Sequence, residues 1–256
     1  MATIHATAII GKNVEIGEDA SVGPFTIIRD NVKIGAHTRI DAHVLIGEMT
    51  TIGEDCQIFH SAVVGERNQD LKYNNEPTET IIGDRTVIRE FCTIHRGTTD
   101  SWKTVVGSDC LLMANVHVAH DVVVGNKVIL ANVASLAGHS IVGDNAIIGG
   151  MTGVHQFSKI GAHAMVGGGN RVVKDIPPYI VANGEPMRFS GLNLIGLRRR
   201  GFSKEAIKEL KNAYNIIFKS DFNVSDAVDE IKKSPYCEEV KNVLDFIAES
   251  DRGILR

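Results

Sequence analysis

Two histidines and an aspartate stand close together in an otherwise aliphatic stretch, MANVHVAHDVVVGN, at residues 113–126. A neutral imidazole, of His117 or His120, is a natural general base near pH 7. Asp121 follows His120 directly, so its carboxylate could orient that ring or stabilise its charged form. No serine or cysteine stands out as an activated nucleophile. The residues therefore favour a reaction in which a hydroxyl of the substrate attacks.

The elements that position these residues follow a period of six. Counting every sixth residue from Ile4 to Val172 gives 29 positions, and 26 of them are aliphatic. Small residues often lie four places later, and three of the cysteines, Cys56, Cys92 and Cys110, occupy that position. A period of six does not match an α-helix and is typical of a β-helix built from hexapeptide repeats. The pattern predicts a solenoid with a stack of aliphatic side chains inside.

Three acidic residues, Asp70, Glu76 and Asp100, break the six-residue frame. They mark two polar insertions, near 66–80 and 96–104. We expect both insertions to loop out of the coil, where loops on a regular scaffold commonly carry function.

A change of pattern near residue 180 predicts two domains. We assign the β-helix to residues 1–180, because the paired prolines of DIPPYIVANGEP cannot continue a strand ladder. A helical domain is expected over 190–256, with Ser203 as the N-cap of its longest helix. Shorter helices are expected near 225–233 and 237–249.

Stacking of the coils predicts which residues meet. If three hexads make one coil, residues 18 apart stack at the strand spacing of about 4.8 Å. His120 then stacks on Gly138 and next on Gln156. His139 lies one place after this column and His155 one place before it, so we expect three histidines to gather along one edge. Gly138 leaves its backbone N–H approachable, which suits an oxyanion donor.

Two other interpretations of the histidines stay open. Neutral histidines also bind zinc, and three can suffice. The γ-type carbonic anhydrases, another hexapeptide-repeat family, bind zinc in this way, although His117 and His120 lie closer together than that spacing. A turn histidine can instead be solvated surface, as we expect where the sequence shows no partner: His37, His43, His60 and His163.

The composition narrows the class of protein. The 256 residues carry 27 Lys and Arg against 31 Asp and Glu, a net charge of −4 that does not favour a nucleic-acid partner. The sequence has no run of 18 apolar residues and no secretory signal, so no integral membrane segment is expected. The four cysteines form no CxxC pair. We expect a cytoplasmic protein with reduced cysteines and with neither a cofactor nor a bound metal.

Blocks outside the repeat carry a family resemblance. They occur in order along the chain: NQDLKY (68–73), EPT (76–78), TIHRGT (93–98), HVAHD (117–121), LAGH (136–139), IIGGMTGVHQF (147–157), MVGGG (165–169), DIPPY (175–179) and RRRGFS (198–203). With them, nearly the whole chain resembles the UDP-N-acetylglucosamine O-acyltransferases, which catalyse the first step of lipid A biosynthesis.

The resemblance implies a fold, an assembly and a reaction. The fold is mainly β, a left-handed parallel β-helix with a C-terminal α-helical domain. The assembly is a homotrimer with active sites between adjacent subunits. The reaction moves a 3-hydroxyacyl group from acyl carrier protein to the glucosamine 3-OH of UDP-N-acetylglucosamine. The later N-acyltransferase of the same pathway is an alternative, but its family carries an extra N-terminal domain, whereas this repeat begins by residue 4.

The resemblance also implies roles for individual residues. His120 falls on the catalytic base, Asp121 on its supporting acid and the Gly138 N–H on the oxyanion donor. Further positions match residues that bind the sugar nucleotide or the acyl donor: Asp70, Lys72, His117, His139, His155, Gln156, Gly168, Asn193, Arg199 and Arg200.

Three of these matches have a further consequence. Gly168 falls where the family limits the acyl channel, so a glycine favours a longer acyl chain. Ile195 stands where the family often has glutamate, so nucleotide recognition is expected to differ in detail. Arg199 and Arg200 suit a diphosphate or an acidic carrier protein, or simply end a helix before Gly201. The sequence leaves open whether the acceptor carries a 3-hydroxyl or a 3-amino group.

Overall fold

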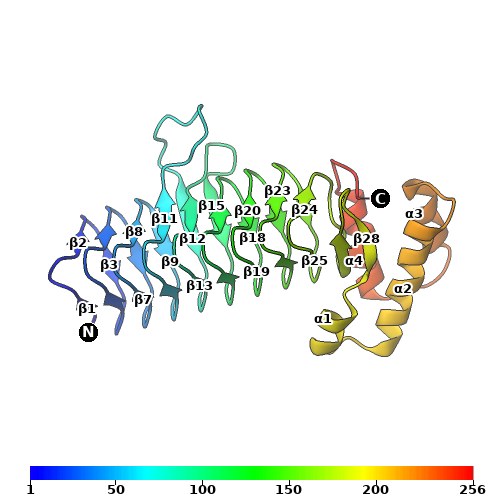
Figure 1. Ribbon diagram of the computed structural model, residues 1–256, viewed down its shortest axis with the longest axis horizontal. Helices are drawn as coiled ribbons and strands as arrows, with labels where there is room; N and C mark the ends of the chain where they lie inside the picture. The colour runs from blue at the N-terminus through cyan, green and yellow to red at the C-terminus, as the bar shows by residue number, and fades with distance from the viewer. Residues whose placement is uncertain (256) are drawn as a thin grey trace.

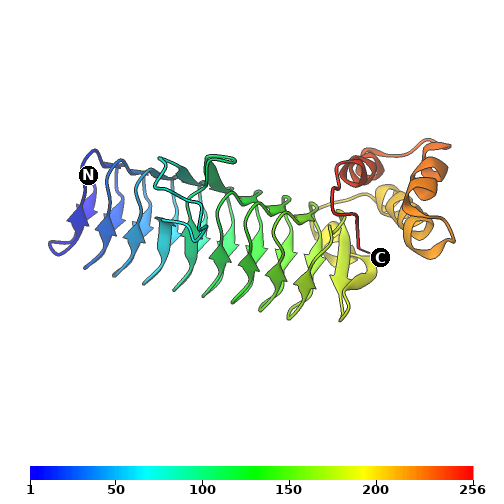
Figure 2. The same cartoon turned by 90° about the horizontal axis from the view of Figure 1, so that it is seen from above.

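Residues 1–255 are described by a computed structural model. Within them, short parallel strands wind into a long prism with three sides, and helices stand beyond its C-terminal end (Figures 1 and 2). Successive strands of one side are 18 residues apart outside the insertions, as in Thr3 opposite Ser21. The predicted fold class, a left-handed parallel β-helix with a C-terminal helical region, is confirmed.

Each side of the prism is one sheet. The first sheet contains β1 (Thr3–Ile4), β4 (Ser21–Val22), β7 (Arg39–Ile40), β10 (Gln57–Ile58), β13 (Val87–Ile88), β16 (Leu111–Leu112), β19 (Ile129–Leu130), β22 (Ile147–Ile148), β25 (Met165–Val166), β27 (Ile180–Asn183) and β28 (Arg188–Leu192). The second contains β2 (Ile9–Ile10), β5 (Ile27–Ile28), β8 (Leu45–Ile46), β11 (Val63–Glu66), β14 (Thr93–His95), β17 (His117–Val118), β20 (Ser135–Leu136), β23 (Gly153–Val154) and β26 (Arg171–Val172). The third contains β3 (Glu15–Ile16), β6 (Lys33–Ile34), β9 (Thr50–Ile52), β12 (Glu79–Ile82), β15 (Lys103–Val106), β18 (Val123–Val124), β21 (Ile141–Val142) and β24 (Lys159–Ile160).

The core is the stack of aliphatic residues that the six-residue period predicts. Ile46 and Val64, for example, face each other in adjacent coils and are both 0% exposed. Full burial of such a side chain stabilises the fold by about 1.5–3 kcal/mol. At the open N-terminal end of the prism the same positions are uncovered, and Ile4 and Ile10 are 45% and 36% exposed.

Each corner of the prism turns through a residue with positive φ. Such residues recur every six positions and include Asp121 (59°), Val133 (65°) and His139 (62°). The left-handed region is costly for residues with a Cβ, most of all for β-branched residues such as Val133. The hydrogen bonds of the strands on both sides of the corner must therefore keep these residues in that conformation. The His139 N–H also donates to the carbonyl oxygen of His120 at 3.2 Å. Asp121 and His139 therefore occupy the same corner of successive coils.

The coil is interrupted at that corner. One loop, 67–78, joins β11 to β12, and a second, 96–102, joins β14 to β15. Both rise from the same edge of the prism (Figure 1). Each loop takes the place of a tight turn in its coil, so the parallel pairing continues on either side, with Thr80 opposite Thr104.

The expectation that the strand ladder stops at the paired prolines is wrong. β27 begins two residues after Pro178 and pairs in parallel with β25, Met165 opposite Val181. Pro177 and Pro178 lie in the turn before β27, where no ladder N–H is required, so they do not break the sheet. The antiparallel strand β28 then closes this edge.

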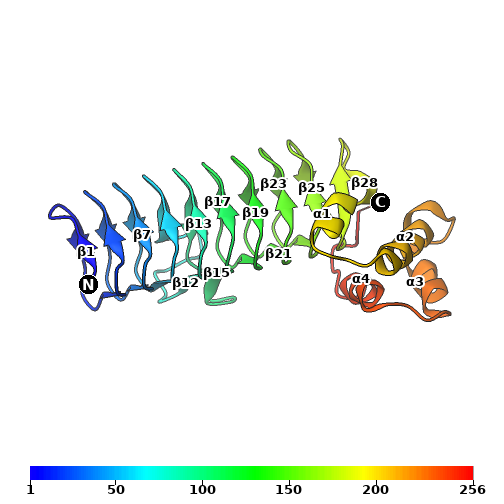
Figure 3. The ribbon, with the colours of Figure 1, turned by 90° about the horizontal axis from the view of Figure 1, so that it is seen from below.

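Helices cover the C-terminal end of the prism. They are α1 (Leu194–Arg199), α2 (Lys204–Lys219), α3 (Val224–Lys232) and α4 (Glu238–Ala248). The side-chain oxygen of Ser203 accepts from the Ala206 N–H at 3.0 Å, which confirms the predicted N-cap of α2. Figure 3 shows α1 beside the last strands and the other helices beyond them. No helix within residues 1–255 is long and apolar enough to cross a membrane.

The segment after α4 returns to the last coil. The Leu255 N–H donates to the Asp175 carbonyl oxygen at 2.9 Å, and the Ser250 hydroxyl donates to Asp175 Oδ2 at 2.6 Å. The buried Tyr214 of α2 donates its hydroxyl to the Pro178 carbonyl oxygen. These bonds fasten the helices to the β-helix.

Candidate active site

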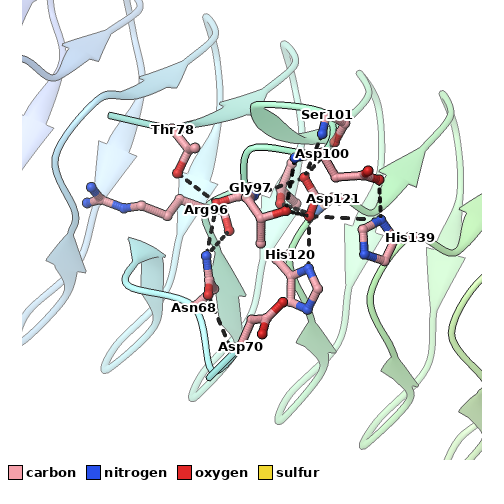
Figure 4. A network of polar contacts seen from close by, with 12 residues as sticks. Asn68, Asp70, Thr78, Arg96, Gly97, Asp100, Ser101, His120, Asp121 and His139 are labelled. Atoms are coloured by element: carbon pink, nitrogen blue, oxygen red, sulfur yellow. Dashed lines mark hydrogen bonds and ion pairs between the residues drawn. The ribbon is translucent and has the colours of Figure 1, made fainter. Parts of the chain in front are cut away.

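His120 and Asp121 form a hydrogen-bonded pair at the corner beneath the two loops (Figure 4). His120 Nδ1 lies 2.9 Å from Asp121 Oδ2, and their side chains are 18% and 0% exposed. Asp121 has the positive φ of a corner residue, and its side chain points inward. Its backbone N–H donates a hydrogen bond to Thr104 Oγ1 at 2.9 Å. The pair therefore has one solvent-accessible end, which is the imidazole.

The charge of Asp121 fixes the proton of His120. Burial would raise the pKa of Asp121, but hydrogen bonds from His120, Ser101 and Thr98 outweigh burial and hold that pKa below its usual range. An ionised carboxylate can only accept hydrogen bonds. His120 Nδ1 must then carry the proton, which leaves Nε2 with a free lone pair. This is the tautomer that a general base requires.

His139 lies against the pair from the next coil. Its ring meets the ring of His120 edge-on at 5.1 Å and stacks on Phe157 at 4.5 Å. Its Nδ1 lies 3.1 Å from Asp100 Oδ2 and 3.9 Å from Asp121 Oδ2. The structure thus brings His120 and His139 together, as the stacking argument predicts.

His155 does not join this cluster. Its Nδ1 bonds to the Gln156 carbonyl oxygen at 3.0 Å, both residues are exposed, and no contact with the ring of His120 or His139 is found within residues 1–255. The corner position 18 residues after His139 belongs to Phe157, so the aromatic ring takes the place we expected for a third histidine.

His117 belongs to a second histidine pair on the other side of His120. Its Nδ1 lies 2.7 Å from Thr93 Oγ1, and its ring meets His95 at 5.1 Å. Burial lowers the pKa of His117, and burial followed by the neighbouring His117 lowers the pKa of His95 to about 4. Both rings are therefore neutral near pH 7 and can donate or accept hydrogen bonds.

Gly138 lies directly under the imidazole of His120. A Cβ at this position would lie 2.6 Å from His120 Cε1 and 2.8 Å from Nε2, so the ring packs where a side chain would be. The Gly138 N–H has no hydrogen-bond partner among the described residues. An unpaired donor beside the base suits the oxygen of a tetrahedral intermediate.

A pocket of about 410 Å³ opens next to this cluster, between the two loops. Asp70 and Lys72 line it from the long loop, Asp100 from the short loop, and His139 and Phe157 from the corner. Asp70 is half-buried, and its Oδ1 accepts from the Lys72 N–H at 2.9 Å. Two of the positions singled out in the first insertion therefore face one cavity with His139.

Asn193 and Arg200, also singled out, lie apart from His120 and His139. Asn193 is buried and caps α1, with its Oδ1 accepting from Gly196 N–H at 3.1 Å. Arg200 ends the same helix and donates to Asn145 Oδ1 at 3.0 Å. No bond within residues 1–255 joins this helix to His120.

The remaining residues noted in the sequence, Arg199, Ile195 and Gly168, are all exposed. Arg199 is exposed on α1, and Ile195, also on α1, is 67% exposed. Gly168 is exposed on a corner of the coil, where a Cβ would lie 3.1 Å from the Gly150 carbonyl oxygen. A side chain at position 168 would therefore lie close to the backbone of the neighbouring coil and would also occupy space on the surface of the coil.

The expectation that the turn histidines have no partner is wrong for three of them. His43 stacks on Phe25 at 5.1 Å, His60 meets Phe91 at 6.1 Å, and His163 stacks on Tyr179 at 5.6 Å. The neighbours come from adjacent coils or, for His163, from the turn before β27, and their types cannot be inferred from a single turn.

Several residues of the site escaped the sequence analysis. His95, Thr98 and Ser101 lie in or beside the second insertion, where the six-residue frame is lost and positions cannot be extrapolated. The block TIHRGT (93–98), which includes His95 and Thr98, was the part of the sequence that could have indicated them. One possible ligand atom from each of His120, Asp121 and His139 lies within 4.8 Å of the other two, a spacing that would also suit a metal ion.

Comparison with known proteins gives a consistent result. Residues 175–255 match the family model described as UDP N-acetylglucosamine O-acyltransferase, domain 2, and residues 23–135 match the GMPPB C-terminal domain. The chain is 48% identical to the acyl-[acyl-carrier-protein]–UDP-N-acetylglucosamine O-acyltransferase of Thermodesulfovibrio yellowstonii, with both chains fully covered. The protein of that name from Chlorobaculum parvum is 52% identical, over 99% of this chain and 97% of the relative. The solved structure of LpxA from Acinetobacter baumannii is 45% identical, covers 99% of both chains and superposes with a TM-score of 0.96.

Proposed function

The chain belongs to the UDP-N-acetylglucosamine O-acyltransferase family, and on that premise we propose that it transfers a 3-hydroxyacyl group from acyl carrier protein to the glucosamine 3-OH of UDP-N-acetylglucosamine. The observation that carries the proposal is the His120–Asp121 pair with Gly138 beneath it. The reaction needs a base, a support for the charged base and a donor for an oxyanion, and these three groups supply them.

The proposed mechanism begins at His120 Nε2. This nitrogen takes the proton of the sugar 3-OH while that oxygen attacks the thioester carbonyl carbon. Asp121 stabilises the imidazolium that forms, and the Gly138 N–H stabilises the carbonyl oxygen as it becomes negative. When the intermediate collapses, the carbon–sulfur bond breaks and the imidazolium returns its proton to the leaving thiolate. The products are the 3-O-acylated sugar nucleotide and the free thiol of the carrier protein.

The remaining site residues are assigned to the substrates. Asp70 and Lys72 line the pocket beside His139, where an amino-sugar nucleotide would place hydroxyls and phosphates. His117, His155 and Gln156 are assigned to the sugar nucleotide or the acyl group by the family resemblance, although none of the three lines this pocket. Two imidazole rings and an amide are suitable hydrogen-bonding partners for sugar and amide groups.

Asn193, Arg199 and Arg200 are assigned to the nucleotide or the donor, although they lie apart from His120 in one chain. A homotrimer with sites between subunits resolves this separation, because α1 of one copy can then approach the histidines of the next. We assign the enzyme to the cytoplasm and to the first step of lipid A biosynthesis, in keeping with its family.

Product analysis tests the function. The purified protein is incubated with UDP-N-acetylglucosamine and 3-hydroxyacyl carrier proteins of graded chain length, and the sugar nucleotide is examined by mass spectrometry. We expect the mass increase of one 3-hydroxyacyl group, faster with long donors because Gly168 leaves room for them. Absence of product with all donors, but an amide product from a 3-amino acceptor, would move the assignment to amide formation.

A chelator distinguishes the metal-binding interpretation. Turnover should be the same after dialysis against a strong chelator, since the proposed steps use only protein groups. Loss of activity that zinc alone restores would favour a zinc enzyme built on His120, Asp121 and His139.

A further inference from the structure

We propose that Thr98 and Ser101 are positioning residues, which hold Asp121 in place so that His120 presents its Nε2 to the acceptor hydroxyl. The inference rests on the proposed function and deepens it. Both residues belong to the loop 96–102, outside the six-residue frame.

The loop holds both oxygens of the Asp121 carboxylate (Figure 4). Thr98 donates its hydroxyl to Oδ2 at 2.6 Å and its N–H to Oδ1 at 2.9 Å. Ser101 donates its hydroxyl to Oδ1, also at 2.6 Å. Distances near 2.6 Å are typical of hydroxyls that donate to a charged oxygen. With His120 on Oδ2, the carboxylate cannot rotate without losing several of these bonds.

The first insertion in turn supports the loop that holds Asp121. The carbonyl oxygen of Gly97 accepts from Asn68 Nδ2 at 2.9 Å and from the Thr78 hydroxyl at 2.7 Å. The chain is tight here, because a Cβ at Gly97 would lie 2.4 Å from the backbone nitrogen of Lys103. A continuous set of contacts therefore runs from the long loop through the short loop to Asp121 and His120.

Loss of the hydroxyls would act on His120 through Asp121. The titratable groups facing Asp121 are His120 and His139, and Asp100 reaches it through His139. A fully buried carboxylate deprived of two donors either turns towards its remaining donors or binds a proton more readily. In either case the hydrogen bond from His120 Nδ1–H to Asp121 is weakened, and the ring is freer to turn Nε2 away from the substrate.

The test uses variants that remove only the hydroxyls. Thr98→Val and Ser101→Ala each lower kcat about tenfold and the double variant about a hundredfold, the scale of one charge-assisted hydrogen bond per site. The KM for UDP-N-acetylglucosamine stays within about twofold of wild type, because both hydroxyls point to Asp121. Thr98→Ser and Ser101→Thr keep a hydroxyl and retain most of the activity.

The pH profile separates positioning from a general structural role. Each lost hydroxyl removes positive partial charge that faces the carboxylate, so the His–Asp pair binds a proton more easily. The acidic limb of kcat/KM therefore moves to higher pH in the double variant. Ser250→Ala removes a hydroxyl-to-carboxylate bond of the same 2.6 Å length at Asp175, far along the chain, and should leave kcat and the pH profile unchanged.

The outcomes are distinguishable from failure of the proposed function. If His120→Ala is inactive while the folded double variant behaves like wild type, the positioning role is overturned and the reaction stands. An unmoved pH profile, or a loss of kcat that Thr98→Ser and Ser101→Thr share, overturns it as well. A wild-type protein that forms no product contradicts the proposed function itself. If the double variant melts early, Ser101→Ala alone decides the question.

Discussion

The ring of His120 packs so closely against the neighbouring backbone that a side chain on that backbone would collide with it. Gly138 is the clearest case, since the imidazole occupies the space of its missing Cβ. The residue in this close contact also has a backbone N–H without a partner among the described residues. In the proposed mechanism, this one residue without a side chain leaves room for the base and donates to the oxyanion.

Substitution at Gly138 tests this arrangement. In Gly138→Ala the new methyl would lie 2.6 Å from Cε1 and 2.8 Å from Nε2 of His120 and must displace the ring. We expect kcat to fall about a hundredfold, within the usual contribution of a general base. Gly153→Ala is the matched control, since a Cβ at Gly153 meets nothing within 4 Å. Wild-type turnover by Gly138→Ala would show that the ring does not need this position.

Buried His95 makes the stability of the protein depend on pH. Its side chain is neutral in the folded state down to a pKa of about 4, whereas an unfolded histidine titrates near 6.5. Between these values the unfolded chain binds the extra proton. The free energy of unfolding should therefore fall as the pH drops from 7 to 4, by about 3 kcal/mol from this residue.

Urea unfolding at pH 7 and at pH 4, with the chain concentration held constant, measures this effect. His95→Gln cannot gain a proton, so its loss of stability between the two pH values should be smaller than that of the wild type. Equal losses in the two proteins would contradict the assignment of His95 as a neutral buried residue.

At the scale of elements, the strand alternation decides which residues support the fold. Ile27 and Ile28 are neighbours in β5, but Ile27 points outward and is 37% exposed, whereas Ile28 points inward and is 1% exposed. Ile28→Ala should lower the free energy of unfolding by about 2–5 kcal/mol, and Ile27→Ala by less than about 1 kcal/mol. Chemical denaturation of both variants measures the difference. Equal costs would contradict the inward stack.

The regular elements were predictable from the sequence because each hexad repeats one environment. The aliphatic frame from Ile4 to Val172 predicted the core, and the 18-residue spacing predicted the contact of His120 with Gly138 and the approach of His139. The assignment of residues 1–180 and 190–256 to separate domains stays a prediction.

The irregular parts could not be predicted, for physical reasons. Thr98 and Ser101 reach Asp121 through a loop whose path depends on contacts with the other loop, at Asn68 and Thr78. No period relates such residues to each other. β27 was missed because proline excludes a ladder N–H only at its own position, and the next residues were free to pair.

At the scale of the whole molecule, the exposed apolar residues favour assembly. Val133 (47% exposed) and Met151 (73%) stack on one corner, and Val123 and Ile141, each 41% exposed, stack on the outer face of one sheet. Contiguous apolar surface of this kind marks protein interfaces. We expect sedimentation to give the mass of three chains. A monomer at micromolar concentration would contradict the homotrimer and leave α1 without a route to the histidines.

The role of His120 is tested most directly by comparing kcat/KM for acyl transfer to UDP-N-acetylglucosamine between wild type and His120→Ala. If His120 is the general base, the variant should fold and assemble like wild type and lose roughly 10²–10⁴-fold of the activity. A folded His120→Ala protein with wild-type kcat/KM would contradict the role of His120 as general base, because the proton of the acceptor hydroxyl would then have to be removed by another group.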